Sequence, residues 1–344
     1  MRLLISLHFV TTFFFFISVC TVECRVCMAG EIATATEFGQ EVLVLSQGDT
    51  VARLAPSAGA NLFSIRVGGT EFLHQPASAE KLSGVSCGVP ILYPTPNRVK
   101  DSSFTFEGKK VDFKPNAGPN FIHGLVNRTK WLVLAQKPSD DSAEITLLAD
   151  FENDTDLAPR FPFPHRLLLT ITVRDASIRW RYTVDNRSGK TSVPFGFALH
   201  PYFRYQGTRA DTFLTIPASH WMQSERQLPS GTLIPAKELD YALKKPITLE
   251  GTKFDDVFFG VSGNTLIDFR SSGHQISIVG SPEFTHLVVW TPDRPFFGIE
   301  NQTCSTDAHN LYANGYQRES NLQICPSGKV MAGWVEYRFS NEPN

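Results

Sequence analysis

The chain has 344 residues, of which 42% are hydrophobic and 19% are charged, and its formal net charge is −2. This length and composition suit a globular protein with a large core and exclude a disordered chain. Because lysine and arginine are scattered and the net charge is close to zero, we expect neither nucleic acid nor a membrane surface as a stable partner.

The chain begins with an apolar run from Leu3 to Val19 that follows Arg2. A positive charge before such a run is typical of a secretory signal peptide. We expect residues 1–29 to be a signal peptide whose cut site is uncertain, and the protein to be secreted or periplasmic. An uncleaved membrane anchor is the alternative, which polar residues inside the run disfavour.

Beyond residue 35 the hydrophobic pattern is short and alternating, which is typical of β-strands. Gly, Pro, Asn and Asp separate the runs, and no sustained i, i+3, i+4 apolar spacing indicates a long helix. We therefore predict an all-β fold, a large antiparallel β-sandwich, with one domain over residues 35–340. The clearest predicted strands are residues 41–46, 61–67, 167–173 and 177–184.

Three of the six cysteines lie in or beside the leader, which leaves Cys87, Cys304 and Cys325 in the body of the chain. A disulfide between Cys304 and Cys325, with Cys87 as a buried thiol, would suit an oxidising compartment. The pairing itself does not follow from the sequence.

Several polar residues are embedded in apolar surroundings, where an ionisable group is costly to bury without a partner. Each has an ordinary structural explanation when taken singly. A lone histidine on an apolar strand is more often a hydrogen-bonded core residue, and Asp-Asp before a strand is commonly a turn. The candidates are Asn97, Arg98, His123, His200, Asp255 with its neighbour Asp256, and Glu300.

Glu300 is the hardest of these to explain structurally, because it directly follows the apolar run Phe-Phe-Gly-Ile. A carboxylate in a partly dry site gains basicity, and a histidine such as His200 converging on it would complete an acid and base pair. Such a pair moves protons at neutral pH without metal or nucleotide. No zinc-ligand spacing, phosphate loop or nucleophile elbow is present, so we expect no cofactor.

Six motifs in order make the chain resemble the aldose 1-epimerase, or galactose mutarotase-like, family across roughly residues 40–335. The resemblance implies a β-supersandwich with an open sugar cleft. It also implies an isomerase that interconverts the α and β anomers of a free aldose. The motifs are residues 88–98 (GVPILYPTPNR), 104–108 (FTFEG), 122–124 (IHG), 194–203 (PFGFALHPYF), 254–258 (FDDVF) and 298–300 (GIE).

The resemblance also implies roles for the candidate residues. His200 would protonate the ring oxygen O5, and Glu300 would remove the proton of the anomeric hydroxyl. The residues implied to bind sugar hydroxyls are Arg98, His123 and Asp255, with Asn97 flanking them.

Two departures from the family pattern lie beside this pair. Asn301-Gln302 after Glu300 differs from the proline and aromatic residue of many relatives, so the wall beside the base does not carry over from them. Leu199 precedes His200 where some mutarotases have a polar residue, so the sugar preference of relatives does not transfer. One alternative is a hexose-6-phosphate 1-epimerase of the same superfamily, although the arginine-rich pattern of that branch is absent. The other is a carbohydrate-binding protein that keeps the cleft without catalysis. A binding protein, however, would need no proton pair.

Overall fold

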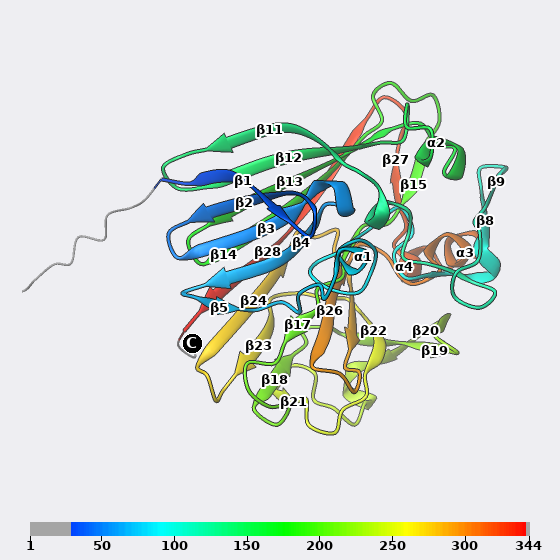
Figure 1. Cartoon of the computed structure of the whole chain (residues 1–344). Coiled ribbons are helices and arrows are strands. Elements are labelled where there is room, and N and C mark those ends of the chain that lie inside the picture. The colour runs from blue at the N-terminus through cyan, green and yellow to red at the C-terminus, as the bar shows by residue number, and fades with distance from the viewer. Residues whose placement is uncertain (1–28, 342–344) are drawn as a thin grey trace, which may run out of the picture.

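The computed structural model describes residues 29–341, which fold mainly as antiparallel strands in three large sheets and three two-stranded ladders (Figure 1). This confirms the predicted all-β sandwich class. The predicted signal peptide lies outside the described residues except for Ala29. No helix within residues 29–341 has the length and apolar character needed to cross a membrane.

The nine-stranded sheet contains two of the predicted strands, β13 and β14. Their alternation buries every second side chain, so that Leu169 pairs with Tyr182 and Ile171 with Trp180 on the core face. In spatial order the strands are β11 (Leu132–Pro138), β12 (Ala143–Asp150), β13 (Arg166–Arg174), β14 (Ser177–Asp185), β28 (Val330–Ser340), β24 (His274–Gly280), β23 (Thr265–Phe269), β18 (Thr212–Thr215) and β21 (Ile247–Thr248).

The five-stranded sheet is a meander in which each strand pairs with the next, and β2 and β3 lie against β13. It includes the predicted strands at residues 41–46 and 61–67. Its members are β1 (Glu31–Glu37), β2 (Gln40–Gln47), β3 (Thr50–Ala55), β4 (Asn61–Val67) and β5 (Thr70–Glu71).

The eight-stranded sheet joins segments that are far apart in the sequence. Its strands are β20 (Leu228–Pro235), β19 (His220–Glu225), β22 (Asp255–Phe259), β25 (His286–Trp290), β26 (Phe296–Gln302), β16 (Ala198–Leu199) and β6 (Ile91–Leu92), with β17 (Phe203–Arg204) also on β26. The two-stranded ladders are β7 (Arg98–Val99) with β10 (Phe121–Ile122), β8 (Ser103–Phe106) with β9 (Lys109–Asp112), and β15 (Val193–Phe195) with β27 (Gln323–Cys325).

The helices are short connections, as the absence of helical periodicity predicts. Among the described residues the longest has six residues. They are α1 (Ala79–Leu82), α2 (Leu157–Arg160), α3 (Ala308–Ala313) and α4 (Gln317–Ser320), with 3₁₀ turns at 56–58, 100–102, 126–128 and 236–238.

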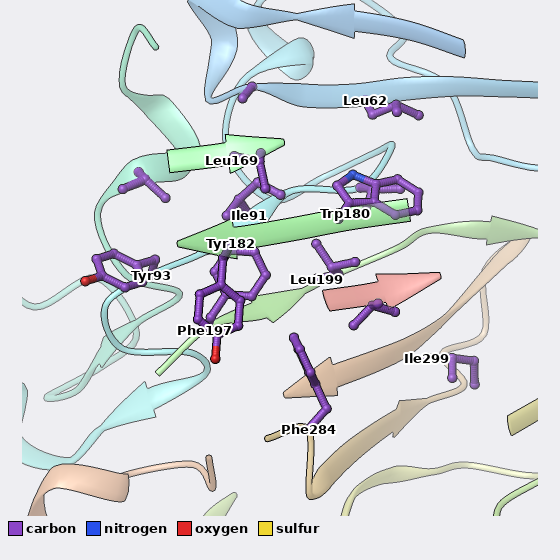
Figure 2. Packing of buried hydrophobic residues seen from close by; sticks show 14 of the residues in the cluster. Leu62, Ile91, Tyr93, Leu169, Trp180, Tyr182, Phe197, Leu199, Phe284 and Ile299 are labelled. Atoms are coloured by element: carbon purple, nitrogen blue, oxygen red, sulfur yellow. The ribbon is translucent and has the colours of Figure 1, made fainter. Parts of the chain in front are cut away.

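One contiguous hydrophobic core joins the three large sheets (Figure 2). Tyr182 of β14 stacks on Phe197 with ring centroids 4.7 Å apart, and Trp180 lies 4.8 Å from Tyr337 of β28. Full burial of each large apolar side chain contributes about 1.5–3 kcal/mol. Ile299 of β26 belongs to the same core, so the strand that carries Glu300 is held on a rigid support.

The disulfide considered between Cys304 and Cys325 is absent, because Cys87, Cys304 and Cys325 are all free and buried. The two sulfurs lie against different segments. Cys304 faces Gly196, whereas Cys325 is paired through β27 with Val193 and its Sγ donates to the carbonyl oxygen of Val184. A disulfide needs Cα atoms closer than about 7 Å, a separation that the sequence does not reveal.

Candidate active site

Strands β16 and β26 bring His200 and Glu300 together. Ala198 pairs with Gln302 across these strands, and the backbone N–H of His200 donates to the carbonyl oxygen of Pro90 at 3.0 Å. Nε2 of His200 therefore lies 3.2 Å from Oε1 of Glu300. Both side chains are buried, at 5% and 3% exposure. The two residues proposed from sequence as a proton pair are in direct contact.

Burial shifts the pKa values of Glu300 and His200 in opposite directions, and both shifts favour the neutral form of the side chain. It raises the pKa of Glu300 to about 8, opposed by the amide of Gln302, and it lowers the pKa of His200 to about 4. Gln302 makes its contribution by donating from Nε2 to Oε2 of Glu300 at 3.0 Å. Between these two values the pair holds one proton, which can pass along the Nε2–Oε1 contact.

The ladder of β7 and β10 positions three more predicted residues. Ile122 pairs with Arg98, and the N–H of His123 donates to the carbonyl oxygen of Asn97 at 2.9 Å. Nη1 of Arg98 donates to Oδ1 of Asn97 at 3.2 Å. The ring of His123 lies edge-on to that of His200 at 5.3 Å. Asn97 and His123 have left-handed φ values of 54° and 71°, a backbone strain that is common at functional sites.

Electrostatics link the same residues. Burial lowers the pKa of Arg98, while the nearby carboxylates of Asp255 and Glu300 oppose this shift. Burial and the neighbouring His200 and Arg98 lower the pKa of His123 well below its ordinary value, so His123 is neutral at physiological pH. A fixed cation and a neutral imidazole thus lie beside the pair.

Asp255 reaches the site from β22. The register aligns Asp255, Trp290 and Gly298 across β22, β25 and β26, and the row two residues further on ends at Glu300. Alternation places both rows on one face of the sheet. Asp256 points to the opposite face, where Oδ1 accepts a hydrogen bond from Nε1 of Trp221 at 2.8 Å. Of the aspartate pair, Asp255 is the one beside the other candidates.

The cavity lined by Asn97, Arg98 and Asp255 is small, about 10 Å³, which is room for one water molecule. Gln227, at the turn between β19 and β20, accounts for the small volume of this cavity, because its Nε2 donates to Oδ2 of Asp255. A sugar ring would have to displace the Gln227 side chain to reach Asp255.

Sequence reasoning assigned no role to three residues of this site. Gln302 and Trp290 were detectable, because Gln302 is two residues from Glu300 and Trp290 ends an apolar strand just before a Thr-Pro-Asp turn. Gln227 had no signal, since only the β19–β20 hairpin brings it here. No cluster of three His, Cys, Asp or Glu side chains within residues 29–341 could hold a metal ion.

Comparison with known proteins identifies a family and several relatives that match large parts of the described chain. The sequence profile of the aldose 1-epimerase family matches residues 41–338. An uncharacterised protein of Escherichia coli (strain K12), YihR, is 24% identical over 223 residues, which cover 61% of this chain and 68% of that protein. Galactose mutarotase of Sus scrofa is 23% identical over 158 residues, 44% of each chain.

Among solved structures, a galactose mutarotase-like protein from Clostridium acetobutylicum has the same fold. It superposes with a TM-score of 0.82 at 18% sequence identity, covering 91% of this chain and 99% of that chain. At this identity the similarity establishes a shared fold.

Proposed function

Because the chain belongs to the aldose 1-epimerase family, we propose that it is an isomerase that interconverts the α and β anomers of a free aldose. The contact between His200 and Glu300, 3.2 Å in a buried site, carries this proposal. An acid and a base held within reach of one ring supply both proximity and proton transfer.

The reaction follows from the single proton that the pair holds. In ring opening, carboxylate Glu300 takes the proton of the anomeric hydroxyl while protonated His200 donates a proton to O5. The C1–O5 bond breaks and C1 becomes an aldehyde. Rotation about C1–C2 exposes the other face, and the reverse transfers close the ring. Burial favours the neutral carboxyl and neutral imidazole, which is the form needed for ring closure.

We assign sugar binding to Arg98, His123 and Asp255, with Asn97 flanking them. Nδ1 of His123 is buried with no hydrogen-bond partner among residues 29–341, and an unpaired buried polar atom calls for an explanation such as a ligand. Arg98 can donate to several hydroxyls from one fixed fork. No cofactor enters any step.

The experiment that tests this function is polarimetry of freshly dissolved α-glucose, α-galactose and β-xylose. Wild-type protein should accelerate the approach to anomeric equilibrium for at least one of them, and Glu300→Gln should not. Sugar binding by calorimetry without any acceleration would instead identify a non-catalytic carbohydrate-binding protein.

Free aldoses should be turned over in preference to their 6-phosphates, because the arginine-rich motif of the hexose-6-phosphate branch is absent. A higher kcat/KM for glucose 6-phosphate than for every free aldose would overturn this substrate assignment.

We also propose that residues 35–340 form a single domain and that the protein is exported with loss of residues 1–29. The intact mass of protein purified from its native source tests the export: a mature chain that still begins at Met1 contradicts it.

A further inference from the structure

A cavity of about 630 Å³ lies beyond the candidate active site, at the Phe296 end of β26. Arginine side chains from three segments line it: Arg204 of β17, Arg209 from the following loop and Arg294 before β26. His74 lines it as well, with its ring 4.6 Å from that of Phe296. None of the described residues that line this arginine cavity is acidic.

The arginine charges are not neutralised by neighbouring carboxylates. Arg204 and Arg294 make no side-chain hydrogen bond or ion pair within the part of the chain that the structure describes. Arg209 is held by backbone carbonyls instead: Nη1 donates to Pro292 and Nη2 to Thr252, each at 2.7 Å. Its Nε also donates to the carbonyl oxygen of Leu249 at 3.3 Å, so Arg209 contributes a fixed positive charge to the cavity wall.

Glu71 is the carboxylate that interacts with Arg204, and its own oxygens are occupied. Oε1 accepts from the backbone N–H groups of Ile65 and Leu73. Oε2 accepts from Ser64 Oγ and from the side-chain amide of Gln75. These four hydrogen bonds hold Glu71 against β4 and the segment that follows β5, and Glu71 makes no ion pair with Arg204.

The arginine cavity is connected to the candidate active site through shared lining residues. Arg209 also lines a neighbouring cavity of about 510 Å³ that contains Trp290 and Asp255. Asp255 in turn lines the small cavity beside Arg98. Each of the three cavities therefore shares a lining residue with the next.

The distance from Glu300 to the arginine cavity exceeds the length of one sugar ring. Arg204 pairs with Phe296 across β17 and β26, two strands that lie side by side in Figure 1. Phe296 is four residues from Glu300, and four residues of strand span about 13 Å. A ring whose O1 contacts Glu300 would not reach Arg204, whereas the next residue of an oligosaccharide would.

We propose that the arginine cavity binds a carboxylate or sulfate on a sugar residue beyond the reducing end, so that acidic oligosaccharides are the substrate class of this protein. This inference rests on the proposed epimerase function for the reducing-end ring. Arginine forks bind carboxylate and sulfate oxygens through charge-assisted hydrogen bonds, and a cavity whose charged lining residues are all arginines attracts the opposite charge. Trp290 in the intermediate cavity offers an aromatic surface against which a sugar ring can pack.

The test compares cellobiouronic acid, which is glucuronic acid linked to glucose, with neutral cellobiose. At low ionic strength the wild-type kcat/KM for anomer exchange should be about tenfold higher for the acid, and added NaCl should reduce this advantage. The double variant Arg204→Gln/Arg294→Gln should lose the advantage and keep its rate on glucose. Lys137→Gln, on the distant edge strand β11, removes one exposed charge as a control and should change neither value.

Equal kcat/KM for both disaccharides, or an advantage that survives in the double variant, would overturn the proposal. An arginine-dependent advantage confined to glucose 6-phosphate would also overturn it, because the anion would then belong to the reacting ring. A disaccharide bearing sulfate distinguishes the two anion sources. Arg294→Gln alone, at an exposed loop position, serves if the double variant does not fold.

Calorimetry separates this inference from the proposed function. Tighter binding of cellobiouronic acid than of cellobiose, lost in the double variant, would support the arginine cavity even if no sugar is turned over. In that case the epimerase proposal alone would fail.

Discussion

Burial of Glu300 should set the alkaline limit of activity, and Gln302 should lower that limit because its Nε2 donates to the carboxylate of Glu300 at 3.0 Å. Activity requires one proton on the pair. Above about pH 8 Glu300 loses that proton while His200, with a pKa of about 4, carries none, so no acid remains. Below about pH 4 both are protonated and no base remains. The wild-type rate should be bell-shaped between these limits.

Gln302→Leu removes this hydrogen bond while keeping a buried side chain of similar size. A hydrogen bond to a charged group contributes about 1.5–3 kcal/mol, and one pKa unit corresponds to about 1.36 kcal/mol. The pKa of Glu300 should therefore rise further, and the alkaline limb should move up by about one to two pH units. Near pH 6, where the pair already holds one proton, the rate should fall much less than in Glu300→Gln.

The assay is anomer exchange by NMR saturation transfer across pH 4–10, with thermal unfolding to confirm that each variant is folded. Asn301→Leu is the matched control, because Asn301 is buried on the same strand but faces away from Glu300. An alkaline limb that stays in place or moves down in Gln302→Leu refutes the reasoning. So does an equal shift in Asn301→Leu.

Three further predictions concern the His200–Glu300 pair, the β19–β20 turn and two N-glycosylation sequons, Asn153-Asp-Thr155 and Asn301-Gln-Thr303. Glu300→Gln and His200→Asn should each lower kcat roughly 10²-fold or more, and the double variant should be little worse than the poorer single one, measured by polarimetry; additive losses would contradict a joint proton transfer. Gln227→Ala should lower KM with little change in kcat, because it removes the side chain that is hydrogen-bonded to Asp255 and that a sugar would have to displace. A raised KM would make Gln227 a sugar ligand instead. In a host that glycosylates secreted chains, peptide mapping should find a glycan at exposed Asn153 and none at buried Asn301, and a modified Asn301 in active protein would contradict the site.

The strands were predictable because their signal is local. Residues 167–173 and 177–184 alternate, and burial of one face requires that alternation. The disulfide considered between Cys304 and Cys325 does not form, because whether two cysteines meet depends on tertiary packing that no spacing in the sequence records.

The candidate site was predictable to the extent that its residues are polar groups in apolar strands. Glu300 and His200 stand out for that reason, and each strand fixes the direction of its own side chain. Gln227 did not stand out, because a glutamine in a polar hairpin turn is ordinary. Its contact with Asp255 exists only once the hairpin has closed over the sheet.

The position of β28 has a consequence for biosynthesis. Residues 330–340 form the strand between β14 and β24, so the nine-stranded sheet is divided into two four-stranded parts until this segment is inserted. When every candidate catalytic residue has been translated but β28 has not, the nascent chain still exposes two open strand edges, those of β14 and β24. Open strand edges are surfaces through which proteins aggregate. Folding of this sheet can therefore be completed only after the β28 segment has been translated.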